Sequence, residues 1–259
     1  MSLYDRLSYF LFGTEKIVDI RQKLALLRER LRNGLQDKTL RMICTGSLGE
    51  GIAYPKSDDD FMIFSDKIQV VRKCSDAVKR LHLVLSYVKD SPGYCLLLDI
   101  NRSYAVDVIC FASGVPIVSS FLWKQKYTTA IEGDSVHGPC CSFVLGREDF
   151  DCAFCIPCNF WPDIAYDWIN RNRANRWPSH EIIQTIVRNK CHVVPVGDPD
   201  SPFHDHSWRI SFSDAERTLI HSFNHVQFLT YSILRLVLID FFHRDELRTS
   251  HFELRTLIS

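Results

Sequence analysis

Hydrophobic residues recur at helical spacing near the start of the chain. Between residues 15 and 33, five apolar side chains lie three or four positions apart: Ile17, Ile20, Leu24, Leu27 and Leu31. This spacing predicts a long amphipathic helix with one apolar face. Asn33-Gly34 follows the stripe and is a typical signal for the end of a helix.

Short apolar runs follow this helix. Residues 40–45 and 60–64 are two such runs on either side of a glycine-containing turn, which predicts strand, turn and strand. Residues 81–88, 94–100 and 105–112 have the length and composition of further strands. We expect these runs to form one mixed or antiparallel sheet in the first half of the chain.

The pattern changes at Pro116. From there, proline and glycine separate four stretches that mostly favour helix: residues 116–131, 161–170, 178–189 and 213–242. A sheet-rich half followed by a helix-rich half is typical of a two-lobed α+β protein. We expect a core with the long helix in residues 1–200 and a helical C-terminal domain in residues 201–259.

Charge and cysteine content restrict the function classes. Lys plus Arg and Asp plus Glu number 31 each, so a nucleic-acid-binding surface would have to be local. The longest apolar run, residues 229–242, is interrupted by Arg235 and Asp240, which indicates a buried helix and no membrane partner. The ten cysteines are scattered and the N-terminus lacks a basic-then-apolar signal, so we expect a reducing, cytoplasmic setting.

The glycine-containing turn is the first candidate site. In the segment Thr45–Gly51, Gly46 has no side chain to keep its backbone amide away from an anion, and Ser47 adds a hydroxyl donor. The segment therefore predicts a turn that cradles phosphate.

Carboxylates follow the turn. Side chains alternate along a strand, so Asp58 and Asp60 would share one face and Asp59 would point away. Asp107 lies between valines, where a charge needs a partner, and a divalent metal is one such partner. These three carboxylates could hold two divalent ions if their strands are neighbours. The alternative is an acidic surface turn, with Asp107 paired to an arginine.

The order of these motifs resembles the nucleotidyltransferases of the cyclic GMP-AMP synthase and male-abnormal-twenty-one group, especially the invertebrate synthase-like receptors. The matching segments run from about residue 40 to 240: Gly46-Ser47 with Glu50-Gly51, residues 57–62, Val106-Asp107-Val108, residues 137–139, Trp161-Pro162 with Trp168, residues 177–179, residues 191–197, and residues 208–213 with Glu216.

The resemblance implies a polymerase-β-like core and a helical C-terminal lobe with nucleotides bound between them. It further implies that Gly46 and Ser47 hold the triphosphate of ATP or GTP, and that Asp58, Asp60 and Asp107 bind Mg²⁺ or Mn²⁺. A ribose hydroxyl would then attack an α-phosphate, with Asp107 as the candidate base, to build a cyclic dinucleotide. The resemblance also implies a role in innate immune sensing, with double-stranded RNA or DNA as the candidate activating partner.

Two further residues match family positions near the nucleobase, Arg209 and Glu216. Glu216 also has the spacing of a helix capping box with Ser213, and we favour that interpretation for it. Arg235 could reach phosphate or extend along its helix to solvent.

Several other groups have an ordinary explanation that competes with a functional one. The cysteines near residues 140–158 could bind zinc, although buried, reduced cysteine is the more common state of such residues. The tryptophans 161, 168, 177 and 208 favour core packing. The cations Arg28, Arg30, Arg32, Lys38 and Arg41 favour a solvated face over a nucleic-acid surface.

The end of the chain differs from the active members of the family. It contains no Tyr-His-x-Lys-Thr segment, so we expect a shortened helical lobe. The first functional hypothesis is a cyclic dinucleotide synthase. The alternative is a catalytically inactive domain that binds nucleotide or a partner.

Overall fold

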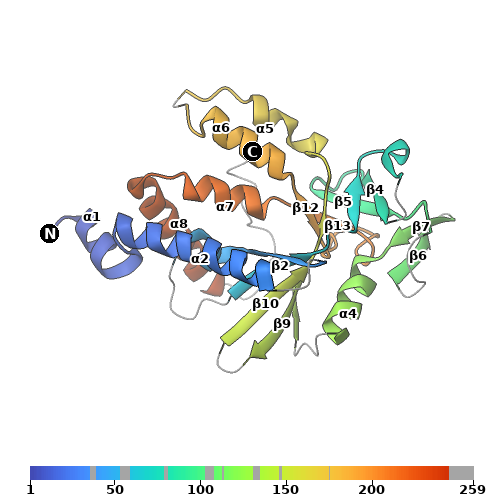
Figure 1. Ribbon diagram of the computed structural model, residues 1–259, viewed down its shortest axis with the longest axis horizontal. Helices are drawn as coiled ribbons and strands as arrows, with labels where there is room; N and C mark the ends of the chain where they lie inside the picture. Colours follow the sequence, from blue (N-terminus) through green and yellow to red (C-terminus); the bar gives the residue numbers. More distant parts are fainter. Residues whose placement is uncertain are drawn as a thin grey trace.

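The structure of this protein is a computed structural model that describes residues 1–35, 39–52, 59–78, 81–102, 108–112, 114–130, 135–145, 148–174 and 176–244. Its strands form two sheets, one of five strands and one of eight, and its helices pack beside them (Figure 1). Mixed sheets and helices of this kind agree with the α+β prediction.

The N-terminal segment is helical. It consists of α1 (Leu3–Arg6), a π-helical turn η1 (Leu7–Phe12) and the long helix α2 (Glu15–Leu35), which confirms the predicted helix. The apolar face of α2 does not pack into the core, however. The apolar stripe lies at the surface, and the buried positions of the helix are Val18 and Ala25.

The five-stranded sheet has the order β1-β2-β10-β9-β8. Its strands are β1 (Arg41–Cys44), β2 (Asp59–Phe64), β8 (Ser135–His137), β9 (Cys140–Leu145) and β10 (Glu148–Phe154). β1 and β2 pair antiparallel, and the short helix α3 (Gly46–Glu50) occupies the predicted turn between them. β10 runs parallel to β2 on its other side.

The eight-stranded sheet follows the order β11-β12-β13-β5-β4-β3, with β7 paired to β5 and β6 paired to β7. Its strands are β3 (Gln69–Val71), β4 (His82–Tyr87), β5 (Tyr94–Leu98), β6 (Ile109–Ala112), β7 (Val115–Val118), β11 (Ile156–Pro157), β12 (His192–Val194) and β13 (Trp208–Ser211). A bridge between Val70 and Cys158 joins its two ends. Trp208 is fully buried in the largest core cluster of this sheet.

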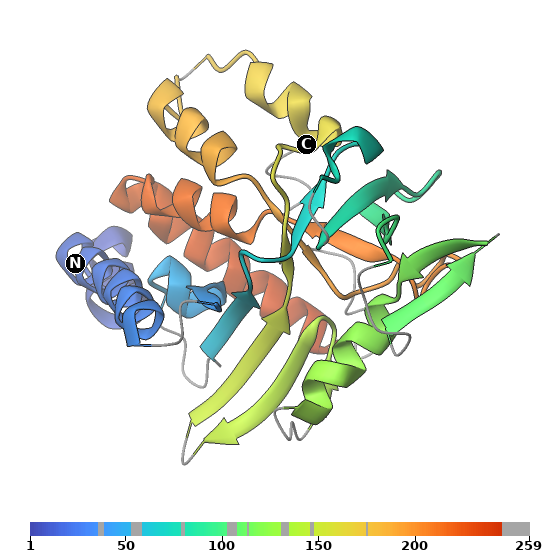
Figure 2. The same ribbon diagram turned by 45° about the vertical axis from the view of Figure 1, so that its right-hand side comes forward.

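The later helices lie on different sides of the sheets. They are η2 (Cys74–Asp76), α4 (Ser120–Ala130), η4 (Asp163–Ala165), α5 (Tyr166–Asn170), α6 (His180–Asn189), α7 (Ser213–His221) and α8 (His225–Arg244). In Figure 1, α5 and α6 are at the top of the molecule, α7 is below them and α4 is at the lower right. In Figures 1 and 2, α7 lies between α6 and α2. Among the described helices, none is both long and apolar enough to cross a membrane.

Two predicted helices have different bounds from those expected. Residues 115–118 form strand β7, because the carbonyl of Pro116 accepts a hydrogen bond from the Asp99 amide (3.0 Å), and the helix begins only at Ser120. The stretch 213–242 is two helices, divided between His221 and His225. The described residues of the second half also contribute six strands, so the division into sheet-rich and helix-rich halves was too simple.

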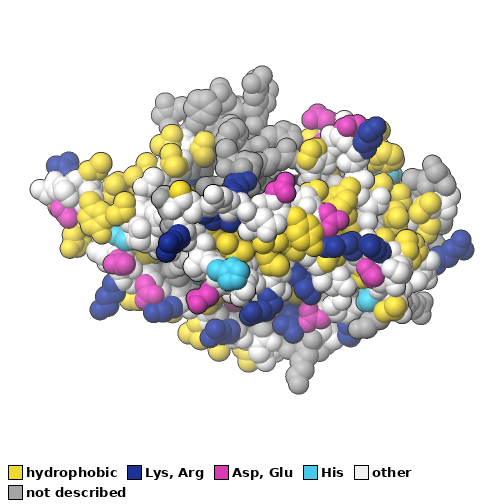
Figure 3. All heavy atoms as spheres, turned by 90° about the horizontal axis from the view of Figure 1, so that it is seen from above, with side chains coloured by type: hydrophobic (Ala, Val, Ile, Leu, Met, Phe, Trp, Pro, Cys, Tyr) yellow, Lys and Arg dark blue, Asp and Glu magenta, His cyan; other side chains and the backbone are white. Residues whose placement is uncertain are grey.

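Strand β13 bears on the predicted domain division. β13 lies beyond residue 200 yet pairs with β5 and β12, while the division at residue 200 stays a prediction. Acidic and basic side chains are intermixed on the face shown in Figure 3.

Candidate metal and nucleotide site

Gly46 lies in close contact with the carboxylate of Asp60. Gly46 begins α3 with a positive φ of 61°, a conformation that side chains other than glycine adopt at a cost. A β-carbon at Gly46 would collide with Asp60 Oδ2. The Thr45 amide also donates to the Asp60 carbonyl over 2.9 Å. The structure therefore brings the glycine turn and one predicted metal ligand together, and the contact requires glycine.

The rest of α3 packs tightly against β1. Ser47 is buried, with 6% of its surface exposed. A β-carbon at Gly49 would lie 2.5 Å from the Cys44 carbonyl oxygen. Glycine at this position thus allows α3 to lie close to the end of β1, which fixes where Gly46 and Ser47 sit.

A second carboxylate faces Asp60 from the neighbouring strand. Asp151 on β10 is in register with Asp60 on β2, and the two strands are parallel. Residues in register on adjacent parallel strands point to the same face of a sheet. Asp151 is oriented by the hydroxyl of Ser142 on β9, which donates to Asp151 Oδ1 over 2.5 Å.

The opposite face of these strands is apolar. Phe61 and Phe150 stack there with their ring centroids 6.1 Å apart, in a core cluster that includes Ala25 of α2. One face of β2 and β10 is therefore anchored under α2. The other face carries Asp60 and Asp151, and both residues are half-buried.

The electrostatic influence of the two carboxylates extends to two neighbouring cysteines, Cys140 on β9 and Cys152 on β10. Burial raises the pKa of Cys140, and the carboxylates of Asp60 and Asp151 raise it further. Burial, with smaller contributions from Cys141, Asp151 and Asp60, raises the pKa of Cys152 to about 12. The Cys140 thiol thus lies close enough to both carboxylates for each of them to raise its pKa.

The other two predicted ligands, Asp58 and Asp107, lie outside the described residues. β6, which follows Asp107, pairs with β7 in the eight-stranded sheet, whereas β2 pairs with β1 and β10. Asp58 and Asp107 therefore stay predictions, and sequence reasoning missed Asp151. The signal was present, because Asp149 and Asp151 repeat the alternation of Asp58 and Asp60.

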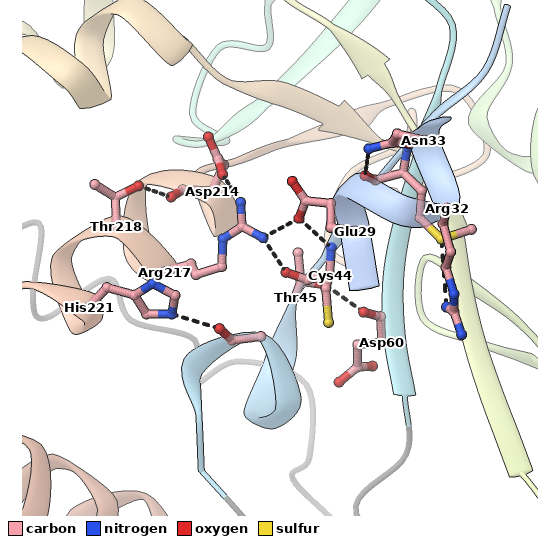
Figure 4. Close-up of polar contacts among 12 residues, drawn as sticks. Glu29, Arg32, Asn33, Cys44, Thr45, Asp60, Asp214, Arg217, Thr218 and His221 are labelled. Atoms are coloured by element: carbon pink, nitrogen blue, oxygen red, sulfur yellow. Dashed lines mark hydrogen bonds and ion pairs between the residues drawn. The ribbon is translucent and has the colours of Figure 1, made fainter. Parts of the chain in front are cut away.

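A buried ionic network attaches α7 to the strand that leads into the glycine turn (Figure 4). Arg217 donates to Glu29 Oε2 over 2.5 Å, to Asp214 Oδ1 over 2.7 Å and to the Cys44 carbonyl over 2.8 Å. Glu29 in turn accepts from the Cys44 amide over 3.1 Å. Both backbone groups of Cys44, two residues before Gly46, are thus held by α2 and α7.

Two more contacts connect the helices to α3. His221 on α7 donates to the Gly49 carbonyl over 2.8 Å (Figure 4). At the end of α3, the buried Glu50 forms an ion pair with Arg235 of α8 and accepts from the Tyr231 hydroxyl over 3.2 Å. Arg235 thus neither extends to solvent nor stands free for phosphate.

The predicted base-contacting residues lie next to this network in the sequence. Arg209 is on β13, which leads into α7, and Glu216 is in the first turn of α7. The predicted capping box is wrong, because Phe212 is the N-cap residue of α7 and its side chain makes no capping hydrogen bond. Whether Arg209 and Glu216 contact a base stays a prediction.

The oxygen ligands on β2 and β10 fit a hard divalent cation. Carboxylates are typical ligands of Mg²⁺ and Mn²⁺. Asp60 and Asp151 supply two of them, but within the described ranges no three His, Cys, Asp or Glu side chains converge as a metal site. The described cysteines belong to no such group either, so the structure gives a zinc site no support.

The tryptophans pack in the core, as predicted: Trp161, Trp168 and Trp208 are all buried.

Comparison with known protein families identifies the domain. Residues 68–222, more than half of the chain, match the model of the Mab-21 protein nucleotidyltransferase domain. The match includes Asp107, Asp151, Arg209 and Glu216, and it begins after Asp60. It confirms the predicted family and, with the mixed sheets and helices, the predicted fold class. The chain therefore belongs to the Mab-21 family and carries its nucleotidyltransferase domain.

Proposed function

We propose that this protein is a metal-dependent nucleotidyltransferase that joins ATP and GTP into a cyclic dinucleotide. The observation that carries the proposal is the pair Asp60 and Asp151, which are in register on parallel strands beside the glycine turn. Family membership supports the reaction class. The choice of ATP and GTP, and a role in innate immune sensing of double-stranded RNA or DNA, rest on the resemblance of the motifs.

The chain's own residues would divide the chemistry as follows. The backbone of Gly46 and Ser47 would hold the triphosphate tail, and Asp60 and Asp151, with Asp58, would hold Mg²⁺ or Mn²⁺. The bound ion would stabilise the charge that develops on the phosphate oxygens. The third carboxylate would accept the proton of the attacking ribose hydroxyl as pyrophosphate leaves.

Asp107 and Asp151 are the two candidates for the third carboxylate of the site. Asp107 matches the family motif in sequence, whereas Asp151 lies opposite Asp60 in the sheet. We favour Asp151, because a shared metal requires its ligands to lie within a few ångströms of one another, and a neighbouring parallel strand about 5 Å away meets that requirement.

Release of pyrophosphate tests the proposed activity. The protein is incubated with ATP, GTP and Mn²⁺ or Mg²⁺, with and without double-stranded RNA or DNA. We expect pyrophosphate and a cyclic product, and we expect Asp60→Asn to abolish both. Asp66→Asn is the matched control, because Asp66 forms an exposed ion pair with Arg41.

Two outcomes would contradict the proposal. Full activity of Asp60→Asn would exclude this carboxylate as a metal ligand. Nucleotide binding without pyrophosphate release under every condition would favour the alternative, a catalytically inactive binding domain.

A further inference from the structure

The apolar stripe of α2 faces solvent along its whole length. Ile17, Ile20, Leu24, Leu27 and Leu31 are 42%, 41%, 49%, 49% and 55% exposed. Scattered exposed leucines are ordinary at protein surfaces, but five in one row form a continuous apolar surface. We call this row the α2 stripe.

α2 is attached to the protein by the face opposite the stripe, where Val18 and Ala25 are buried beside hydrogen-bonding side chains. Gln22 donates to the Glu50 carbonyl over 3.1 Å, and Glu29 accepts from the Cys44 amide. Asn33 hydrogen-bonds to the outer edge of β1 in the way that a neighbouring strand would. Its side-chain amide donates to the Met42 carbonyl over 2.9 Å, and its side-chain oxygen accepts from the Met42 amide over 2.8 Å. The α2 stripe is therefore not what holds this helix in place.

The spacing of the α2 stripe is that of a coiled coil. Its members alternate three and four residues apart, as the a and d positions of a heptad do. Such a two-position stripe is narrower than the apolar face of a helix that is buried in a globular core or laid on a membrane. The spacing therefore favours one partner helix over a broad surface.

Basic residues flank the α2 stripe on both sides. Lys16, Lys23 and Arg30 lie seven residues apart on one flank, and Arg21 and Arg28 lie on the other. Within the part of the chain that is described, Arg28 and Arg30 form no ion pair, whereas Lys23 pairs with Asp19 over 2.8 Å.

These charges disfavour a second copy of the chain as the partner. In a parallel pair, Lys23 of one helix would face Arg28 of the other, and in an antiparallel pair each flank would face itself. Both arrangements place cations against cations, and like charges at these positions oppose pairing.

We propose that the α2 stripe docks an acidic amphipathic helix of a partner protein. The partner would carry leucine or isoleucine at its a and d positions and Glu or Asp at the flanking positions, which complement Arg28 and Arg30. A groove of about 320 Å³ continues the surface toward η1 and is lined by Tyr9, Phe10, Leu11 and Ile17. Figure 3 shows hydrophobic side chains gathered at this N-terminal end of the molecule.

A designed peptide tests the proposal without knowledge of the natural partner. The probe is a fluorescent peptide about three heptads long with Leu at a and d and Glu at e and g, and a second peptide carries Lys at e and g. Fluorescence anisotropy with the full chain should show binding of the Glu peptide and at least about tenfold weaker binding of the Lys peptide.

Variants then locate the site. Leu24→Ser with Leu27→Ser should weaken binding of the Glu peptide by about tenfold or more, since both side chains lie in the contact. Arg28→Glu with Arg30→Glu should reverse the preference toward the Lys peptide. Leu234→Ser is the matched control, because Leu234 is an exposed apolar residue on α8, and it should leave binding unchanged.

Several results would overturn the proposal. They are absence of binding to the Glu peptide, equal binding of both peptides, and unchanged binding by the Leu24/Leu27 double variant. A dimer in analytical ultracentrifugation that the double variant dissolves would assign the surface to a second copy. Binding to phosphatidylserine vesicles that the double variant abolishes, without peptide binding, would assign it to a membrane.

Discussion

Removal of the Arg217 guanidinium should destabilise the protein strongly. Arg217→Met keeps much of the length and packing of the side chain but leaves Glu29 and Asp214 buried without their cation. The side chains of Arg217, Glu29 and Asp214 are only 9%, 17% and 12% exposed, so water replaces little of the lost interaction. The variant therefore creates uncompensated buried charge close to the glycine turn.

The size of the effect follows from this burial. Breaking a buried ion pair by removing one partner costs about 3–5 kcal/mol, mostly because the other charge remains unpaired. Arg217 also donates to the Cys44 carbonyl, which adds about 1 kcal/mol for the lost hydrogen bond. We expect the free energy of unfolding to fall by at least about 3 kcal/mol.

Urea unfolding followed by tryptophan fluorescence measures this loss. Lys23→Met is the matched control, because the Lys23–Asp19 pair is exposed and should contribute only about 0.3–0.5 kcal/mol. Adding Glu29→Gln and Asp214→Asn to Arg217→Met should restore part of the stability, since the stranded charges are then gone. A loss below about 1 kcal/mol for Arg217→Met would refute the claim that a buried network holds α7 against β1.

Three further predictions concern the glycine turn, the buried His192 and the predicted carboxylates Asp58 and Asp107. Gly46→Ala should cost roughly 1–2 kcal/mol of unfolding free energy, because Gly46 has a left-handed backbone, and it should reduce turnover by displacing the Asp60 carboxylate. Gly34→Ala is the control: its added methyl group meets no other atom of the described residues, and it should stabilise α2 by roughly 0.5–1 kcal/mol. Urea unfolding measures the stability of both variants, and pyrophosphate release measures their turnover. Burial lowers the pKa of His192 to about 4, so the unfolded chain binds a proton below pH 6.5 that the folded protein does not, and stability should fall by about 3 kcal/mol between pH 6.5 and pH 4. In pH-dependent unfolding, His192→Gln should flatten this slope, and an unchanged slope would show that His192 is not its source. Asp58→Asn should abolish pyrophosphate release with little loss of stability, and so should Asp107→Asn if Asp107 is a ligand; unchanged product yield in either variant would exclude that residue as a ligand.

Periodicity in the sequence predicted where α2 lies but not which face it buries. The apolar stripe is the stronger pattern, and a helix normally packs by such a face. In the structure, α2 turns its opposite face inward: Val18 and Ala25 are buried there, beside hydrogen bonds made by Gln22, Glu29 and Asn33. These hydrogen bonds depend on backbone groups of β1 and α3 that are distant in sequence, so local periodicity contains no information about them.

The candidate site was predictable only where its residues are close in sequence. Gly46 and Asp60 are linked by a short stretch of chain, and their motif could be read directly. Asp151 is 91 positions beyond Asp60 and meets it only through the parallel pairing of β10 with β2. Pairing of distant parallel strands is set by the whole fold, and local sequence pattern does not specify it.

Binding of Mn²⁺ tests the central claim that Asp60 and Asp151 form a metal site. Electron paramagnetic resonance measures free Mn²⁺ during titration of the protein with a non-hydrolysable ATP analogue present. The account predicts that Asp60→Asn and Asp151→Asn each weaken Mn²⁺ binding by at least about tenfold, since each removes a charged ligand. Asp66→Asn should bind Mn²⁺ as the unmodified protein does. Undiminished Mn²⁺ binding by Asp151→Asn, together with lost binding by Asp107→Asn, would contradict the site and return the third carboxylate to Asp107.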